Sequence, residues 1–378
     1  MVGKQRLSSV VRPIVGLLFL YLFLVGIRLI GHSFSLFGHD FYEQLINIYS
    51  NPFAGLFTGI LVTSIIQSSS TTTSLVVGLA GSGVITIESA VPIIMGANMG
   101  TTVTSTLVSL SFLTRKEDFR RAFSAATMHD FFNMFTIIIF FPLEITFHII
   151  QKSATFFTEL FQGVGGVTLV SPLKYLIDPV VQSITDILLR IPRIPETAVG
   201  IILLVLSLIM IVITLVYLVK LLRSMIVNQA ENMIERYLFK NTFTAFLLGL
   251  LLTAIIQSSS VTISLVVPLV AAGLLNIKLA YPFVLGANIG TTVTAILASL
   301  AVVGEGGLEG VGMAGLTVAF CHLLFNLYGV VVFLPLRRIP LFCATHLADL
   351  AAKSRIWAFV FITFIFFLIP LMLVFITR

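Results

Sequence analysis

The sequence predicts an all-α polytopic membrane protein with two inverted-topology repeats, each holding a re-entrant QSSS hairpin and a broken helix. The first observation behind this prediction is compositional: 58% of the 378 residues are hydrophobic and only 10% are charged. A soluble globular chain carries about 25% charged residues, so a surface this poor in charge must mostly face membrane lipid. The second observation is an internal repeat, and the third is the opposite charge of its loops.

Four apolar runs have the length of a bilayer crossing, which takes about 20 residues. They are residues 14–30, 198–219, 314–335 and 357–376. Lys4, Arg6 and Arg12 precede the first run, as basic residues precede the apolar core of a secretory signal peptide. No small-residue cleavage site follows, and the rest of the chain is equally apolar. We therefore interpret the first run as a membrane helix.

Charge and cysteine content argue against two other classes of protein. The net charge is +6, but the Lys and Arg residues lie in short loops, where they set orientation and do not indicate nucleic-acid binding. Cys321 and Cys343 are isolated thiols without the spacing of a metal site or a disulfide framework. We expect neither a nucleic-acid partner nor an organic cofactor, and the sequence carries no signal for an oligomeric state.

The internal repeat pairs residues 67–104 with residues 257–294. At a constant offset of 190, 22 of the 38 aligned residues are identical. Both segments begin with QSSS and end with GAN-x-GTTVT, and further along the chain His129 corresponds to His322. A duplication of this kind predicts that each half of the chain folds into the same set of helices.

The loop charges predict that the two repeats insert with opposite orientation. Residues 115–121 are basic, whereas the equivalent residues 304–312 hold two Glu and no Lys or Arg. Before the first QSSS, residues 31–52 carry only acidic charges, whereas residues 220–240 before the second QSSS contain four Lys or Arg. Positive loops remain cytoplasmic. The halves therefore follow the inverted-repeat plan of secondary transporters, which places the binding site near the membrane midplane.

The chain divides into four parts on this plan. They are a first repeat at 1–150, an external linker at 151–195, a second repeat at 196–336, and an interfacial segment with a C-terminal transmembrane helix at 337–378. The segment from Pro52 to Gly83 holds about 30 residues, which fits two short legs of a hairpin or one strained crossing. We expect the hairpin.

Two polar runs interrupt the apolar helices, Gln67–Ser70 and Gln257–Ser260. Such residues are costly in hydrocarbon unless they line a cavity or are buried in protein. Glycines flank Asn98 and Asn288, which predicts a helix break at each GAN-x-GTT segment, although glycines spaced by four also serve as helix-packing motifs. A broken helix offers free N–H groups to an anion and free carbonyls to a hard cation such as sodium.

The motifs contain no Lys, Arg, Asp or Glu. Neutral oxygens bind sodium weakly enough to release it, and a bound anion then depends on the cation for its counter-charge. This dependence is the thermodynamic basis of a symporter. Asp130 stands apart as an intramembrane carboxylate, which is a functional candidate by default. Its repeat equivalent is Leu323, so we interpret Asp130 as an ion site that is present in one half only.

The motifs resemble those of the type II sodium-dependent phosphate cotransporter family (Na/Pi cotransporters). The resemblance rests on QSSSTTTSLVV, PIIMGANMGTTVT and ATMHDFFN in the first half, and on QSSSVTISLVVPL, YPFVLGANIGTTVTAILASL and CHLLFNLYG in the second. It covers approximately residues 50–150 and 240–375. It implies sodium-driven import of inorganic phosphate, mainly in its divalent form. Residues 151–195 lack the Asn and Cys of the glycosylated, disulfide-linked outer loop of animal members, so we expect a bacterial member in the cytoplasmic membrane.

The resemblance also implies a set of site residues. We expect the phosphate pocket to be formed by the motif serines, with the asparagines of the predicted helix breaks beside them: Ser68, Ser69, Ser70, Ser258, Ser259, Ser260, Asn98 and Asn288. The expected sodium ligands are Gln257, Ser258, Thr291 and Thr294 at one site and Gln67, Thr101 and Thr104 at its counterpart. Asp130 resembles the residue of current-generating members, which implies an additional sodium ion and electrogenic transport.

Three alternatives remain open on the sequence. A symporter for another oxyanion, such as sulfate or a dicarboxylate, fits the same physical argument, because only the resemblance selects phosphate. An intramembrane serine hydrolase would use a motif serine with His129 or His322 as base, but the chain has no G-x-S-x-G nucleophile elbow. We therefore do not expect an enzyme. A passive channel would conduct without coupling to sodium.

Overall fold

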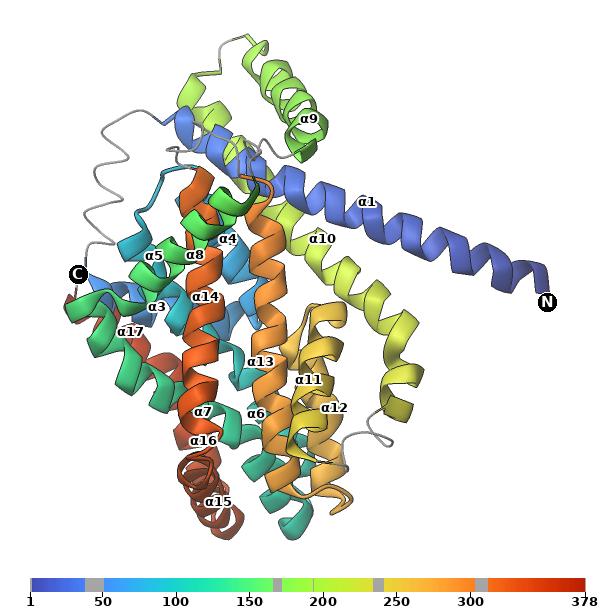
Figure 1. Ribbon diagram of the computed structural model, residues 1–378, viewed down its shortest axis with the longest axis vertical. Coiled ribbons are helices and arrows are strands. Elements are labelled where there is room, and N and C mark those ends of the chain that lie inside the picture. Colours follow the sequence, from blue (N-terminus) through green and yellow to red (C-terminus); the bar gives the residue numbers. More distant parts are fainter. Residues whose placement is uncertain are drawn as a thin grey trace.

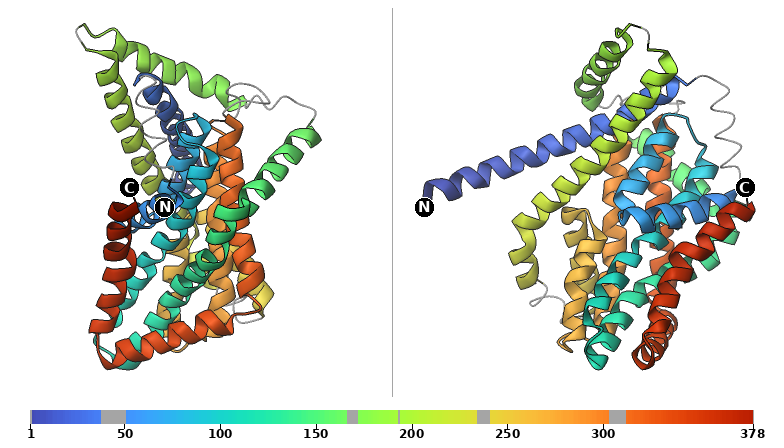
Figure 2. Two further views of the ribbon diagram at one scale, coloured as in Figure 1. Left: turned by 90° about the vertical axis from the view of Figure 1, so that its left-hand side faces the viewer. Right: turned by 180° about the vertical axis from the view of Figure 1, so that it is seen from behind.

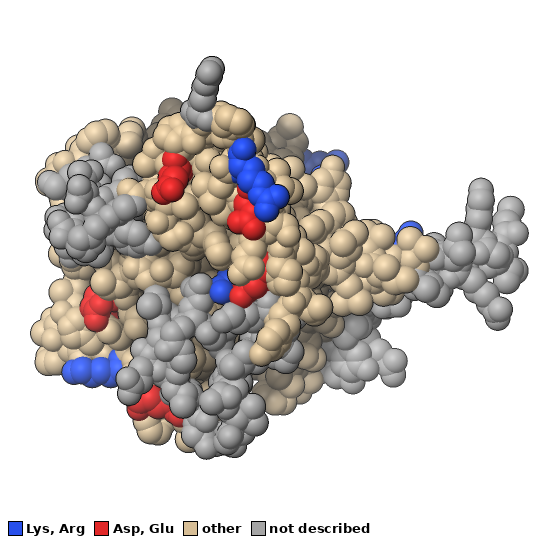
Figure 3. All heavy atoms as spheres, turned by 90° about the horizontal axis from the view of Figure 1, so that it is seen from above, with Lys and Arg blue, Asp and Glu red and all other residues tan. Residues whose placement is uncertain are grey.

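A computed structural model describes residues 2–37, 51–165, 172–192, 194–233, 241–302 and 312–377. Within these ranges the chain contains helices and no strand. Seven helical segments are long and apolar enough to cross a membrane. The prediction of an all-α polytopic membrane protein is confirmed. Viewed from the end that carries the helix between the two halves, charged side chains are few on the described surface (Figure 3).

The helices follow the order of the two repeats (Figure 1). The first half contains α1 (Val2–Ser35), α3 (Pro52–Ile66), α4 (Ser69–Gly81), α5 (Ile87–Thr101), α6 (Val103–Ser109), α7 (Lys116–Phe147) and α8 (Ile149–Gly165). Helix α9 (Pro172–Leu189) lies between the halves. The second half contains α10 (Glu196–Met233), α11 (Thr242–Ile256), α12 (Ser259–Ala271), α13 (Ile277–Ser299), α14 (Gly312–Phe333), α15 (Arg338–Lys353), α16 (Ile356–Thr363) and α17 (Ile369–Thr377), with a π-helical turn between the last two.

Each QSSS motif lies at the turn of a helical hairpin. Helices α3 and α11 have 15 residues, and α4 and α12 have 13. A helix of this length spans about 20 Å, which is short of the ~30 Å hydrocarbon core. The first leg ends at Gln67 or Gln257, each with a left-handed φ of 57°. The side chain of Ser68 or Ser258 then caps the second leg. Both motifs therefore have two short legs.

Equivalent helices of the two repeats run in opposite directions (Figure 1). Helices α5 and α6 descend from the end near α9 to the end near α15, whereas α13 ascends, and α7 and α14 are opposed in the same way. The halves are therefore related by a pseudo-two-fold axis perpendicular to these helices. This arrangement agrees with the predicted inversion, which would place the axis in the membrane plane.

The predicted helix break at the GAN-x-GTT segments is found in one repeat only. Helix α13 runs unbroken through its motif, whereas in the first repeat Thr102, inside the motif, separates α5 from α6. The glycines of both segments allow the hairpin leg to pack closely. A Cβ atom at Gly96 would clash with the carbonyl oxygen of Leu56, and one at Gly286 would clash with that of Phe246. The glycines therefore serve as helix-packing residues in both repeats.

Each hairpin is buried against the opposite repeat. Helix α12 packs on α7 in a core cluster that contains Met128 and Phe132 from the first half. Helix α4 packs on α13 and α14 in a second cluster that contains Ala298 and Val318. This exchange brings the two QSSS turns, which are 190 residues apart in the sequence, to the centre of the molecule.

The segment predicted as a linker is helical where it is described. Helix α9 crosses the upper end of the molecule and α15 crosses the lower end (Figure 2). Arg28 of α1 holds Asp178 of α9 through its Nε atom at 2.9 Å, and the Tyr21 hydroxyl donates to the carbonyl oxygen of Leu176 at 2.9 Å. Helix α9 is thus fastened to α1.

Part of the charge pattern that predicts the orientation lies outside the described residues. This holds for Asp40, Glu43, Arg236, Lys240, Glu305 and Glu309. The assignment of the linker and the charged loops to particular faces of the membrane therefore stays a prediction.

Candidate functional site

The two QSSS turns meet between the repeats. The Ser70 hydroxyl at the start of α4 donates to the carbonyl oxygen of Gln257 at 3.1 Å. The same hydroxyl lies 3.5 Å from the Thr294 hydroxyl of α13. Ser70 and Thr294 are both buried, with 6% and 0% of their surface exposed. Three residues that were assigned to the site from the sequence are therefore in contact across the repeat interface.

A cavity of about 310 Å³ lies where the turns meet. It is lined by Ile66, Gln67, Ser68, Ser70, Thr71, Leu215, Val216, Val219, Lys220, Gln257, Ser258 and Val261. The polar residues come from both motifs, and one apolar wall comes from α10. Both turns therefore contribute to a single cavity, as the inverted-repeat argument predicts.

The cavity adjoins the N-terminal ends of two helices. The Ser68 Oγ accepts a hydrogen bond from the Thr71 backbone N–H at 3.2 Å, and Ser258 Oγ accepts one from the Val261 N–H at 3.4 Å. Both caps satisfy one N–H of their helix and leave others free. A helix N-terminus carries about +0.5 elementary charge. Two such ends at one cavity favour an anion, and the free carbonyls that end α3 and α11 favour a cation.

The remaining motif serines do not line the cavity. Ser69 and Ser259 are buried behind it, with 4% and 2% of their surface exposed, and Ser260 is half-buried. Among the motif serines, the cavity is lined by Ser68, by its second-repeat partner Ser258, and by Ser70. Ser260, the second-repeat partner of Ser70, does not line it.

The predicted sodium-site threonines divide into two groups. The Thr101 hydroxyl donates to the Ala97 carbonyl at 2.8 Å, and the Thr291 hydroxyl donates to the Ala287 carbonyl at 3.1 Å, so each bonds back to its own helix. Thr294 contacts Ser70, as described above. Its repeat equivalent, Thr104, has a buried hydroxyl with no hydrogen-bond partner. The two half-sites are therefore not equivalent in this structure.

Asn98 and Asn288 do not line the cavity; they tie the repeats together. His129 Nε2 lies 3.2 Å from Asn288 Oδ1, and His322 Nε2 lies 3.2 Å from Asn98 Oδ1. The Asn288 amide also donates to the side-chain oxygen of Asn326 at 2.7 Å and to that of Asn133 at 3.0 Å. Both side chains are buried in the helix packing of this structure, and the assignment of these asparagines as phosphate ligands stays a prediction.

Asp130 lies outside the cavity in a buried position on α7. It is 1% exposed, and its Oδ2 atom accepts a hydrogen bond from the Thr106 hydroxyl at 2.9 Å. Its Oδ1 atom has no partner. The repeat equivalents of these two residues are Leu323 and Ile296. A buried carboxylate with an unpaired oxygen is costly, so a bound cation or a proton is the chemistry that suits this position.

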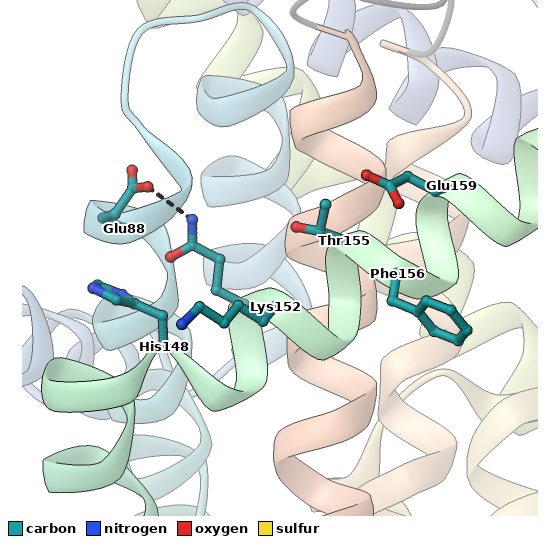
Figure 4. A pocket seen from close by; sticks show the side chains of 7 residues that line it. Glu88, His148, Lys152, Thr155, Phe156 and Glu159 are labelled. Carbon is teal, nitrogen blue, oxygen red and sulfur yellow. Dashed lines mark hydrogen bonds between the residues drawn. The ribbon is translucent and has the colours of Figure 1, made fainter.

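A larger cavity, of about 410 Å³, lies between α5 and α8 (Figure 4). Glu88 accepts a hydrogen bond from the Gln151 side chain at 2.7 Å there, and Glu159, His148 and Lys152 complete its charged lining. It contains no repeat-motif residue, and its carboxylates would repel an anion. We therefore assign the candidate site to the smaller cavity.

Sequence reasoning missed the contribution of α10. Leu215, Val216, Val219 and Lys220 line the cavity, although they lie outside the repeat motifs. The only signal in the sequence was a lysine at the end of an apolar run, which we interpreted as a topology signal.

Comparisons with known proteins identify the family to which the chain belongs. The family described as Na+/Pi-cotransporter matches residues 22–170 and 208–372. The chain is similar to the human protein named sodium-dependent phosphate transport protein 2B, with 32% identity over 448 residues that cover 95% of this chain and 64% of that protein. It is also similar to rat sodium-dependent phosphate transport protein 2A, with 34% identity over 421 residues that cover 93% of this chain and 65% of that protein.

The chain spans just under two thirds of the length of these relatives, which are transport proteins and not enzymes. No solved structure matches the chain. The family match includes both QSSS hairpins, whose turns line the cavity, and both GAN-x-GTT helices. The resemblance noted in the sequence is confirmed, and the chain belongs to the Na+/Pi-cotransporter family.

Proposed function

We propose that this protein is a sodium-coupled symporter that imports inorganic phosphate, mainly divalent, across the cell membrane. The observation that carries the proposal is the meeting of the two QSSS turns at one cavity, with two helix N-termini beside it. The relatives named above are sodium-dependent phosphate transport proteins, which supports phosphate over sulfate or a dicarboxylate.

Phosphate binds in the cavity between the two turns. Ser68, Ser70 and Ser258 supply hydroxyl donors, and the first turns of α4 and α12 supply backbone N–H groups. Hydroxyl and backbone donors can surround a tetrahedral oxyanion from several directions, whereas the motifs contain no basic side chain that would hold it in the absence of sodium.

Sodium binds to neutral oxygens beside the phosphate. At one site these come from Gln257, Ser258, Thr291 and Thr294, and at its counterpart from Gln67, Thr101 and Thr104. A threonine hydroxyl that donates to its own helix, as Thr291 does, still has free lone pairs for a cation. Because sodium brings the counter-charge, each ligand raises the affinity for the other, and this reciprocity couples the two fluxes.

Asp130 adds a third cation to the cycle. Its unpaired Oδ1 atom lies in the first repeat only, next to Thr106. A sodium ion bound there during transport, with no counterpart in the second repeat, makes the cycle electrogenic. We place the protein in a bacterial cytoplasmic membrane with residues 151–195 on the external side, and no organic cofactor takes part.

The test is uptake of labelled phosphate by purified protein in proteoliposomes, with and without an inward sodium gradient. We expect uptake only with sodium, and we expect arsenate, but not sulfate or succinate, to compete. Stronger competition by sulfate than by phosphate would refute the substrate assignment. Flux that persists without sodium would indicate a channel, and labelling of a motif serine by a fluorophosphonate would indicate a hydrolase.

A further inference from the structure

Among the described residues that line the candidate cavity, Lys220 is the one charged side chain. It lies on α10, in the last turn of the candidate membrane span Glu196–Leu222. An ionisable residue within a membrane span is a functional candidate by default, because hydrocarbon penalises its charge. Its position next to two helix N-termini concentrates positive potential on one cavity.

No carboxylate pairs with Lys220 among the described residues. Over the same part of the chain, the ion pairs are formed by Arg28, Arg115 and Arg120. The Lys220 ammonium lies instead 5.3 Å from the ring centroid of Tyr217, one helical turn earlier. Tyr217 is 52% exposed and does not line the cavity. A cation–π contact at an exposed site is weak, so this contact does not neutralise the lysine.

The Lys220 side chain can reach both the cavity and the Tyr217 ring. Its ammonium is a compact charge on a flexible four-carbon stem, and its residue contributes to the cavity wall while the ammonium rests on the tyrosine ring. An anion that enters the cavity offers a stronger partner than the ring does. The side chain then needs only rotamer changes, with no movement of α10.

We propose that Lys220 is an anion-steering residue, whose ammonium rests against Tyr217 when the cavity is empty and pairs with the incoming oxyanion. This inference rests on the proposed function. A lysine at an exposed position is screened by salt and water, so it raises the local concentration of phosphate without holding phosphate in place of sodium. Steering of this kind is therefore compatible with coupling through neutral motifs.

The experiment compares Lys220→Gln and Lys220→Arg in proteoliposomes at fixed sodium concentration. The KM for phosphate is measured in uptake and in efflux, because the face to which the cavity opens decides which value changes. Removing one nearby charge is expected to raise one of these KM values about three- to ten-fold. We expect Vmax to change less than about twofold, and Lys220→Arg to restore the KM, because the charge is what steers.

Ionic strength gives a second readout that a purely structural role would not change. Choline chloride should raise the KM of the unsubstituted protein by screening the lysine, and it should have a smaller effect on Lys220→Gln. The matched control is Lys152→Gln, which removes a lysine from the cavity between α5 and α8 and should leave both KM values unchanged.

Chemical rescue separates charge from shape. Lys220→Cys is prepared with Cys321→Ala and Cys343→Ala, which removes the two native thiols. Modification with a methanethiosulfonate that carries an aminoethyl group should restore the KM, and a sulfonatoethyl group should not.

The outcomes are distinct. Normal sodium-dependent uptake with both KM values unchanged in Lys220→Gln overturns the role of Lys220 and leaves the proposed function standing. A fall in Vmax that neither arginine nor the aminoethyl group reverses also overturns the steering role. Absence of sodium-dependent phosphate uptake in the unsubstituted protein refutes the proposed function and this inference with it.

Discussion

The first repeat carries Asp130 and Thr106 where the second carries Leu323 and Ile296. In contrast, the helix-packing glycines are the same in both halves, and they approach the backbone of the neighbouring helix equally closely. Duplication has therefore kept the glycines that set the distance between helices and the QSSS and GTT residues of both motifs, whereas the position of Asp130 has diverged. The proposed asymmetry between the repeats lies in this one carboxylate and its neighbour.

The largest expected effect concerns the helix-packing glycines that the two repeats share. Gly96→Ala and Gly286→Ala each place a methyl group against a backbone carbonyl of the hairpin leg, which cannot move aside easily. We expect each to destabilise the protein by about 3 kcal/mol or more. Thermal unfolding of the purified proteins measures this loss. Gly16→Ala is the control, since its nearest atom would be 3.5 Å away. If only one of the two alanine substitutions destabilised the protein, the two glycines would not have equivalent packing roles in the two repeats.

The second test concerns the two half-sites. Thr294 contacts Ser70, whereas the Thr104 hydroxyl has no partner. We expect Thr294→Val to raise the sodium concentration for half-maximal uptake about tenfold, which is the loss of one hydrogen bond or ligand worth roughly 1.4 kcal/mol. Thr104→Val should also raise it at the same phosphate concentration, but by a smaller factor, because the Thr104 hydroxyl makes no contact here that the substitution would break. A larger effect at Thr104 than at Thr294 would show that the difference between the two half-sites in this structure is reversed during transport.

The third test isolates the carboxylate. Asp130→Gly removes the proposed additional cation site without touching the cavity between the QSSS turns. We expect the transport current to fall more than phosphate uptake does, so the charge moved per phosphate should decrease. Parallel recording of current and labelled uptake in the same membranes gives this ratio. An equal loss of both would count against an ion at this position.

The smallest expected effect tests the orientation. The substitutions Arg115→Gln and Lys116→Gln remove charges at the start of α7, far from the cavity lining in the sequence and on no motif. We expect fewer correctly inserted molecules and an unchanged KM for phosphate. Protease protection gives the first quantity and initial uptake rates give the second. A change in KM would mean that the loop acts on the site and not on insertion.

Composition and repetition were enough to predict the helical class and the hairpin turns. The outcome at the GAN-x-GTT segments was not predictable in the same way, because a glycine such as Gly286 looks identical whether it frees the backbone or admits a neighbouring helix. Only the position of α11 distinguishes the two cases. The burial of Asn98 and Asn288 away from the cavity was not foreseen for this reason, and Lys220 was missed because a charge at a helix end also reports orientation.

The crossed pairing of His129 with Asn288 and of His322 with Asn98 has a mechanical consequence. Each half supplies one ring and one amide to the other, so a rotation of either half stretches both links at once. Breaking them would leave four buried polar groups without partners, which is costly. The two links therefore stabilise the arrangement of the halves seen in this structure against a rotation of one half relative to the other.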